Sequence, residues 1–260
     1  MAHRLSAWGG SGDASRRRRS GGAAVVAVTR GLPLTAVLVG LTVTTGMVEA
    51  VSYLALGHVF TAMMTGNLLL LSFACAGGGG LSVAASSVSF GAFVAGAGAG
   101  ARLEAALGAR RHRWFVIALV VEAVILAAAG LTAWRIEPVQ EQMSGRYYGV
   151  VALVAAAMGI RSVTMLRADI PDLATTVATR LLTALVNGVF LGAGHGPDRP
   201  AAERREAHRG ATVAAMFAGG LLGAWLLHLH WRPYALLLLV GAVVLVIAGA
   251  YAFSPRHRRL

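Results

Sequence analysis

Apolar residues gather in eight long blocks along the chain, separated by short polar or basic stretches. A helix needs about 20 consecutive apolar residues to cross the hydrocarbon core of a bilayer. Four blocks plainly meet that length: Trp114–Trp134, Tyr147–Leu166, Gly210–Leu229 and Tyr234–Phe253. Four weaker blocks are Leu32–Leu56, Val59–Ala76, Leu81–Ala101 and Leu173–Gly194. The pattern predicts an all-α polytopic membrane protein whose main partner is the lipid bilayer. Composition agrees, since only 13% of the residues are charged, where a soluble domain carries about 25%.

The basic residues lie in segments that flank the apolar blocks. Residues 1–30 hold six Arg against Asp13, residues 102–113 hold four Arg against Glu104, and residues 254–260 hold three Arg. Because cytoplasmic loops collect Arg and Lys, we place all three segments, and so both termini, in the cytoplasm. We do not read the net charge of +12 as nucleic-acid binding, because no aromatic-rich basic face for stacking bases accompanies it. All 23 basic residues are Arg, which together with abundant Ala and Gly indicates a GC-rich bacterial genome and hence the inner membrane.

Counting crossings divides the chain further. We expect a disordered Arg-rich arm (1–30), a transmembrane domain (31–253) and a basic tail (254–260). Two cytoplasmic segments must be separated by an even number of crossings, yet three apolar blocks lie between the arm and the 102–113 loop. The odd block is 59–76, which is interrupted near Met64–Asn67 and stops at Gly77–Gly80. Block 173–194 poses the same problem in the second half. We therefore predict six full transmembrane helices plus two broken or re-entrant helices.

The two halves of the chain resemble each other. Gly46–Glu49 leads to Thr65–Asn67, and Gly159–Ser162 leads over nearly the same distance to Thr179–Leu181. Further on, Phe90 followed by Gly96-Ala97 matches Phe217 followed by Gly223-Ala224. Repeat one covers about 33–101 and repeat two about 147–229, with a linking span at 114–134 and a last span at 234–253. The first unit starts outward and the second inward, so we expect inverted repeats, an arrangement typical of secondary transporters.

A family pattern is carried by Gly46, Glu49, Phe60 and Met64–Asn67, and again by Ala157–Arg161 and Thr175–Thr179. Over roughly residues 33–253 the chain resembles the YoaK-like family of bacterial membrane proteins, a domain of unknown function. The resemblance implies the fold and the location and supplies no activity. The chain departs from the family in having Glu49 for the usual Asp, Arg161-Ser162 for a frequent amide pair, and Arg180 for a frequent Gly.

Six residues are candidates for binding a solute or ion: Glu49, Thr65, Asn67, Arg161, Thr179 and Arg180. Ionised groups within bilayer-length segments are expensive, so they usually pair or line a solute path. We expect Glu49 and Arg161 to face each other near the midplane. Two roles stay open for Glu49: a coupling carboxylate that takes up and releases a proton, or a structural ion pair with Arg161 or Arg180.

The other polar residues have simpler expected roles. Thr65 and Asn67 are expected first to cap the helix at the break and second to contact a solute. For Glu122 we expect a structural hydrogen bond. No metal site is predicted, because His228 and His230 lack a third ligand nearby in sequence, and no cofactor is predicted.

The leading functional hypothesis is a small-solute or ion transporter or permease. A non-transporting membrane scaffold or signalling protein is the alternative, with the Arg-rich arm binding anionic lipid. An intramembrane enzyme is less favoured, because the eight His scatter and no catalytic triad emerges. Glycines with small-xxx-small spacing indicate close helix packing, within one chain or between the chains of a homo-oligomer.

Overall fold

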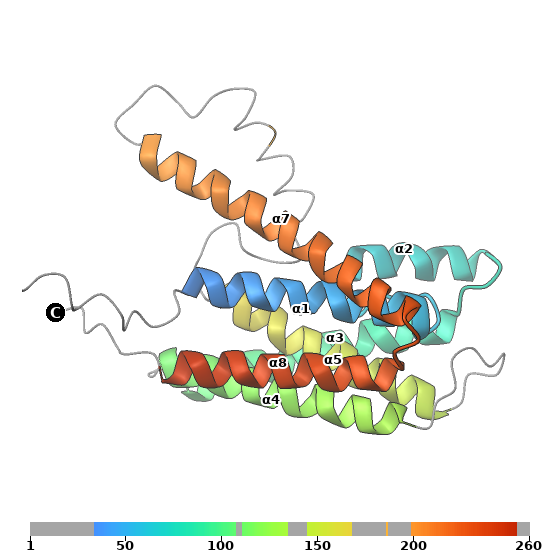
Figure 1. The fold of residues 1–260 in the computed structure, drawn as a ribbon. Coiled ribbons are helices and arrows are strands. Elements are labelled where there is room, and N and C mark those ends of the chain that lie inside the picture. Colours follow the sequence, from blue (N-terminus) through green and yellow to red (C-terminus); the bar gives the residue numbers. More distant parts are fainter. Residues whose placement is uncertain (1–33, 108–110, 135–144, 168–185, 187–198, 254–260) are drawn as a thin grey trace, which may run out of the picture.

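The computed structural model describes residues 34–107, 111–134, 145–167, 186 and 199–253, and the regular elements there are helices (Figure 1). They are α1 (Leu34–Ala55), α2 (Met64–Cys75), α3 (Val83–Leu107), α4 (Arg111–Ala133), α5 (Gly145–Arg167), α7 (Arg199–His228) and α8 (Pro233–Ala252). The predicted arm 1–30 and tail 254–260 lie outside these residues.

Within the described residues, six helices are long and apolar enough to cross a membrane, and they match the six blocks predicted as full spans. They are α1, α3, α4, α5, α7 and α8. In contrast, α2 has 12 residues and is therefore about 18 Å long, well short of the roughly 30 Å of a hydrocarbon core. The interrupted block 59–76 is thus a short helix that does not cross. Its predicted counterpart, 173–194, lies outside the described residues.

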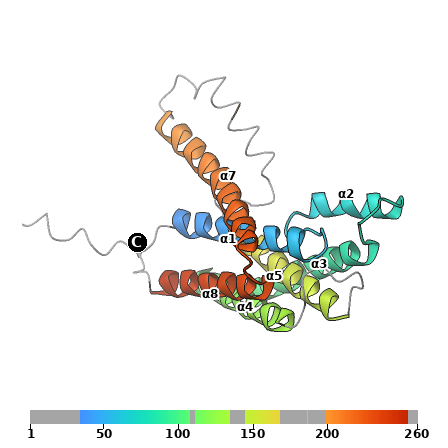
Figure 2. The same ribbon diagram turned by 45° about the vertical axis from the view of Figure 1, so that its right-hand side comes forward.

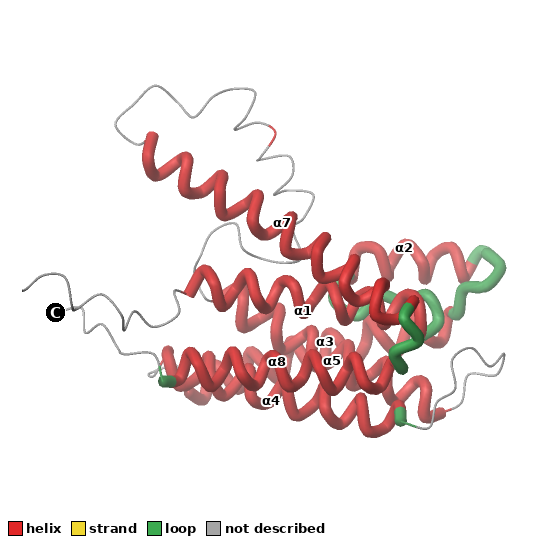
Figure 3. The backbone as a smooth tube through the Cα atoms, in the orientation of Figure 1, coloured by secondary structure: helices red, strands yellow, loops and turns green. Residues whose placement is uncertain are grey.

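The chain folds back on itself between α1 and α2. After α1 ends at Ala55 it turns through Gly57 and His58, which have positive φ angles of 76° and 59°. Thr61 then lies beside Glu49, since its backbone N–H donates to that carboxylate. Glu49 precedes the end of α1 by six residues, so this segment re-enters the bundle to a depth of about 9 Å. Figure 3 shows the connection from α2 to α3 in green, at the end of the bundle where α1 ends.

The spanning helices form three packed pairs: α1 with α7, α3 with α5, and α4 with α8. In Figure 1, α1, α4 and α7 run in one direction and α3, α5 and α8 run in the opposite direction. The first half therefore runs up, down, up, and the second half down, up, down. The N-terminal half of α7 points away from the other helices (Figure 2).

Glycines let the first two pairs approach backbone to backbone. A Cβ on Gly46 of α1 would collide with the backbone of Met216, Gly219 and Gly220 in α7, and Gly219 in turn lies against Val43. Small residues at such crossings allow close van der Waals packing between helices in a membrane.

The α3–α5 crossing repeats the α1–α7 crossing residue by residue. Adding 113 to the number of a residue in α1 gives the number of its counterpart in α5, as for Gly46 and Gly159. Adding 123 to the number of a residue in α3 gives the number of its counterpart in α7, as for Gly96 and Gly219. The remaining close contacts obey the same shifts: Val43–Gly219 with Ala156–Gly96, and Met47–Gly223 with Ile160–Gly100.

These contacts correct the register expected between the two halves. The sequence comparison paired Gly96 with Gly223, whereas the contacts pair Gly96 with Gly219, four residues earlier. Glycine recurs four residues later on the same face of both helices, at Gly100 and Gly223. A shift by one helical turn therefore keeps the sequence match, and only the contacts distinguish the two registers.

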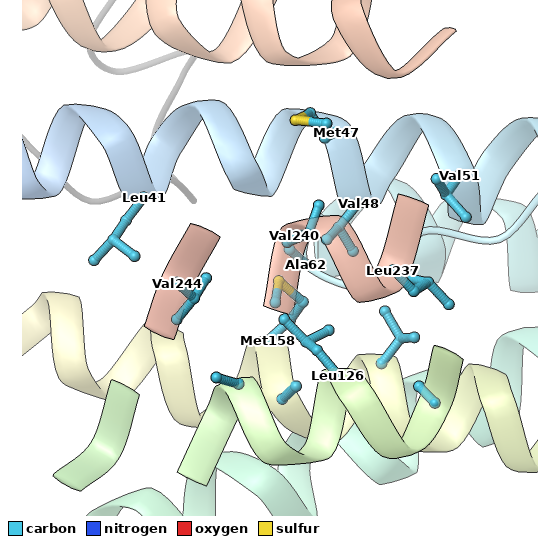
Figure 4. Close-up of a cluster of buried hydrophobic side chains, with 14 of the residues drawn as sticks. Leu41, Met47, Val48, Val51, Ala62, Leu126, Met158, Leu237, Val240 and Val244 are labelled. Carbon is cyan, nitrogen blue, oxygen red and sulfur yellow. The ribbon is translucent and has the colours of Figure 1, made fainter. Parts of the chain in front are cut away.

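A buried apolar cluster fills the space between α1, α4, α5 and α8 (Figure 4). Its fully buried members include Leu41 and Val48 of α1, Leu126 of α4, Met158 of α5 and Val240 of α8. Three of these helices also carry buried charged residues: Glu49 on α1, Glu122 on α4 and Arg161 on α5.

Candidate functional site

Three acidic or basic side chains are buried among the described residues of the bundle. They are Glu49 on α1, Glu122 on α4 and Arg161 on α5, exposed by 5%, 0% and 1%. Burial of an ionised group without a partner is costly, so the contacts of each group decide what it can do.

Arg161 links three helices. Its Nη2 forms an ion pair and hydrogen bond with the Glu122 carboxylate of α4. Its Nη1 donates to the Leu41 carbonyl oxygen at 2.9 Å and to the hydroxyls of Thr44 and Thr45 at 2.8 and 2.9 Å, all on α1. A planar guanidinium suits this work, because it presents several donors in a fixed fork.

The Arg161–Glu122 pair overturns one expectation and agrees with another. Arg161 was expected to face Glu49, and its ionic partner is Glu122 instead. Glu122 was expected to make a structural hydrogen bond, and it makes one as half of a buried ion pair. Both charges of that pair are compensated within the bundle, which leaves Glu49 as the third buried ionisable group.

Glu49 binds the re-entrant segment. Its Oε1 accepts hydrogen bonds from the Thr61 backbone N–H at 3.0 Å, from the Thr61 hydroxyl at 3.2 Å, and from the Ala62 backbone N–H. The Thr61 hydroxyl also lies 3.0 Å from that of Ser52. Thr61 and Ala62 precede Met63, the N-cap residue of α2. Glu49 therefore holds the segment that leads into α2 against the side of α1.

The expected local capping by Thr65 and Asn67 is wrong. The N-cap position of α2 is Met63, and no side chain of the helix caps it. Thr65 is exposed, whereas Asn67 is buried and donates from Nδ2 to the Ser86 carbonyl oxygen of α3 at 3.2 Å. Glu49 accepts from Thr61 and Ala62, which lie before the N-cap, so it binds the approach to α2 and not the helix itself.

Several buried atoms at this site have no hydrogen-bond partner within the described parts of the chain. They are Glu49 Oε2 and Asn67 Oδ1 near the break, and Glu122 Oε2 and Arg161 Nε at the ion pair. Native interiors leave few such atoms unpaired. Glu49 differs from the other two ionisable groups because it also lacks an ionic partner among the described residues.

Four of the six predicted site residues lie within the described part of the chain. Glu49 and Asn67 both lie at the break between α1 and α2, Thr65 lies on the exposed surface of α2, and Arg161 lies at the centre of the bundle. Thr179 and Arg180 lie outside the described residues.

Sequence reasoning missed Thr44 and Thr45, and it assigned Glu122 a hydrogen bond without naming its partner. These three residues and Arg161 form the central polar cluster. A usable signal existed for Glu122. Opposite charges in two consecutive spans, joined by the short 135–146 loop, come together when those spans pack antiparallel.

Comparison with protein families matches residues 37–250 to the family described as "Protein of unknown function (DUF1275)". The chain belongs to the DUF1275 family. It is also 30% identical over 154 residues to the UPF0700 transmembrane protein YoaK of Bacillus subtilis (strain 168), which covers 57% of this chain and 64% of that protein. The aligned part spans less than two thirds of the relative's length. No solved structure matches.

Membership in DUF1275 agrees with the resemblance drawn from Glu49, Thr65–Asn67 and Arg161. It establishes a multi-pass bacterial membrane protein and assigns no activity.

Proposed function

We propose that the protein is a small-solute or ion transporter of the bacterial inner membrane, built from two inverted units, with both termini in the cytoplasm. Glu49 is the ion-exchanging group, and the break between α1 and α2 is the site. The proposal assigns no catalytic chemistry to the chain.

The observation that carries the proposal is the state of Glu49. It is buried within a span, it lies at a helix break, and one carboxylate oxygen has no partner among the described residues. Ionisable groups at such depth mark solute or proton paths unless they are paired. Arg161 and Glu122 neutralise each other, so the same argument does not extend to them.

Two features of the fold support the inverted arrangement. The helices of the second half run opposite to their counterparts in the first half, and the two glycine crossings correspond under constant shifts of 113 and 123. Inverted repeats with a broken helix near a buried charge are shared by many secondary transporters. Non-helical backbone is tolerated at membrane depth only where protein or a watery cavity covers it, and Glu49 supplies part of that cover.

The test uses purified protein in liposomes that enclose a pH-sensitive dye. A thermal-shift screen of small anions, cations and neutral solutes first identifies a candidate solute. We then expect that solute to drive proton or charge movement in the native protein, a loss of at least about tenfold in Glu49→Gln, and recovery in Glu49→Asp, which keeps the carboxylate.

Glu104→Gln is the matched control, because Glu104 is a partly exposed glutamate near the end of α3. It should transport as the native protein does. The proposal fails if no solute produces movement, or if Glu49→Gln transports like the native protein.

A further inference from the structure

The two halves are equivalent at their glycine crossings and unequal elsewhere. The helices α4 and α8 are the third spanning helix of each half and run in opposite directions (Figure 1), so the α4–α5 interface corresponds to the α8–α1 interface. Yet α4 packs on α5 far more extensively than α8 packs on α1. The structure therefore holds two equivalent interfaces in different states, one tight and one looser.

The tight interface contains the buried ion pair, and the loose one does not. Arg161 of α5 binds Glu122 of α4. The shift of 113 places Val48 of α1 where Arg161 stands on α5, and Val48 belongs to the buried apolar cluster (Figure 4). The α1–α8 interface is apolar elsewhere too, since the side chain of Ile247 packs over Gly40.

We propose that the Arg161–Glu122 pair fastens one of two interchangeable interfaces. In a second conformation of the protein, α8 closes on α1 while α4 loosens from α5, and the glycine crossings α1–α7 and α3–α5 act as fixed pivots. The inference rests on the two-unit part of the proposed function and adds the identity of the fastening residues.

Membrane physics explains why one ion pair can decide between the two states. Apolar side chains gain no hydrophobic free energy by leaving lipid for another helix, so packing and polar contacts decide which helices associate. The two crossings make equivalent contacts, and in the proposed change they keep these contacts, so they do not favour either conformation. The pair is present in only one, and breaking it leaves a charge buried without its partner.

Two matched cysteine positions report on the two interfaces. Val154 precedes Arg161 by seven residues on α5, so it lies two turns away on the same face. Its counterpart under the shift of 113 is Leu41, which precedes Val48 by seven residues on α1. Both side chains are 0% exposed. Cys75, the one native cysteine, is exposed at the end of α2 and is first replaced by Ser.

The experiment measures N-ethylmaleimide labelling of Leu41→Cys and Val154→Cys by intact mass, with the full chain in phosphatidylethanolamine–phosphatidylglycerol liposomes. In the native background Leu41→Cys should react faster than Val154→Cys. With Glu122→Gln added, the Val154→Cys rate should rise about tenfold and the Leu41→Cys rate should fall, as a population shift between two states requires.

A second variant decides the matter if Glu122→Gln does not fold. The double variant Arg161→Val with Glu122→Val makes the α4–α5 interface as apolar as its counterpart, and Thr44 and Thr45 keep their own bonds to the Leu41 carbonyl oxygen. The two labelling rates should then agree within about twofold, since neither state is fastened.

Equal rates in the native background, an equal rise at both positions, or no change in either variant would overturn the inference. The labelling needs no solute, so its outcome does not depend on finding a transported solute. Loss of the labelling asymmetry therefore counts against the fastening role alone, and absence of solute-driven movement counts against the proposed function alone.

Discussion

The Glu49 side chain on α1 accepts a hydrogen bond from the backbone N–H of Thr61, 3.0 Å away on the segment that re-enters the bundle. A single carboxylate thus joins the segment between α1 and α2 to the side of α1. The same group that holds the segment leading into α2 is the one proposed to exchange an ion. Substitutions that keep or remove its acceptor oxygen separate the two roles.

Glu49→Gln and Glu49→Leu should differ in stability. Gln keeps an acceptor oxygen for the N–H groups of Thr61 and Ala62, whereas Leu leaves both buried donors unsatisfied, at about 1–3 kcal/mol each. We expect Glu49→Leu to unfold at a clearly lower temperature than Glu49→Gln in detergent, followed by scanning fluorimetry. Equal melting temperatures would show that the bonds to Oε1 do not hold the re-entrant segment.

The Arg161–Glu122 pair should show strong coupling in a double-mutant cycle. Arg161→Leu or Glu122→Leu alone leaves one buried charge without its partner and should lower the free energy of unfolding by about 3–5 kcal/mol. The double variant should be near neutral. Unfolding in mixed micelles gives this free energy for all three variants. Additive losses would mean that the two charges do not depend on each other.

Alanine should be tolerated at some α3 glycines and rejected at others. A Cβ on Gly96 would collide with the Ala156 backbone, whereas one on Gly91 or Gly98 meets nothing within 4 Å. We expect overpacking in Gly96→Ala to lower the free energy of unfolding by about 1–3 kcal/mol. Gly98→Ala should be neutral or slightly stabilising, because Ala is the better helix former.

The same test applies to α7 and checks the equivalence of the two crossings. Gly219→Ala would collide with the Val43 backbone as Gly96→Ala does with Ala156. Their losses in melting temperature should be similar. A tolerated Gly219→Ala beside a damaging Gly96→Ala would contradict the equivalence.

The sequence by itself determined the membrane class, the six crossings and the interrupted block after α1. These follow from the lengths of the apolar runs, because a bilayer imposes a fixed span and admits only helices with internally satisfied backbones. It also identified Glu49 and Arg161 as buried charges, since any ionisable residue within such a run is conspicuous.

Tertiary structure alone decided which groups these charges meet. Arg161 has Glu122 as its ionic partner because α4 and α5 pack antiparallel, and Glu49 binds Thr61 because the chain turns back at His58. It also decided the register between the halves, in which Gly96 corresponds to Gly219. Glycines that recur every four residues give the same sequence match after a shift of one helical turn. Only the backbone contacts at the crossing distinguish the two registers.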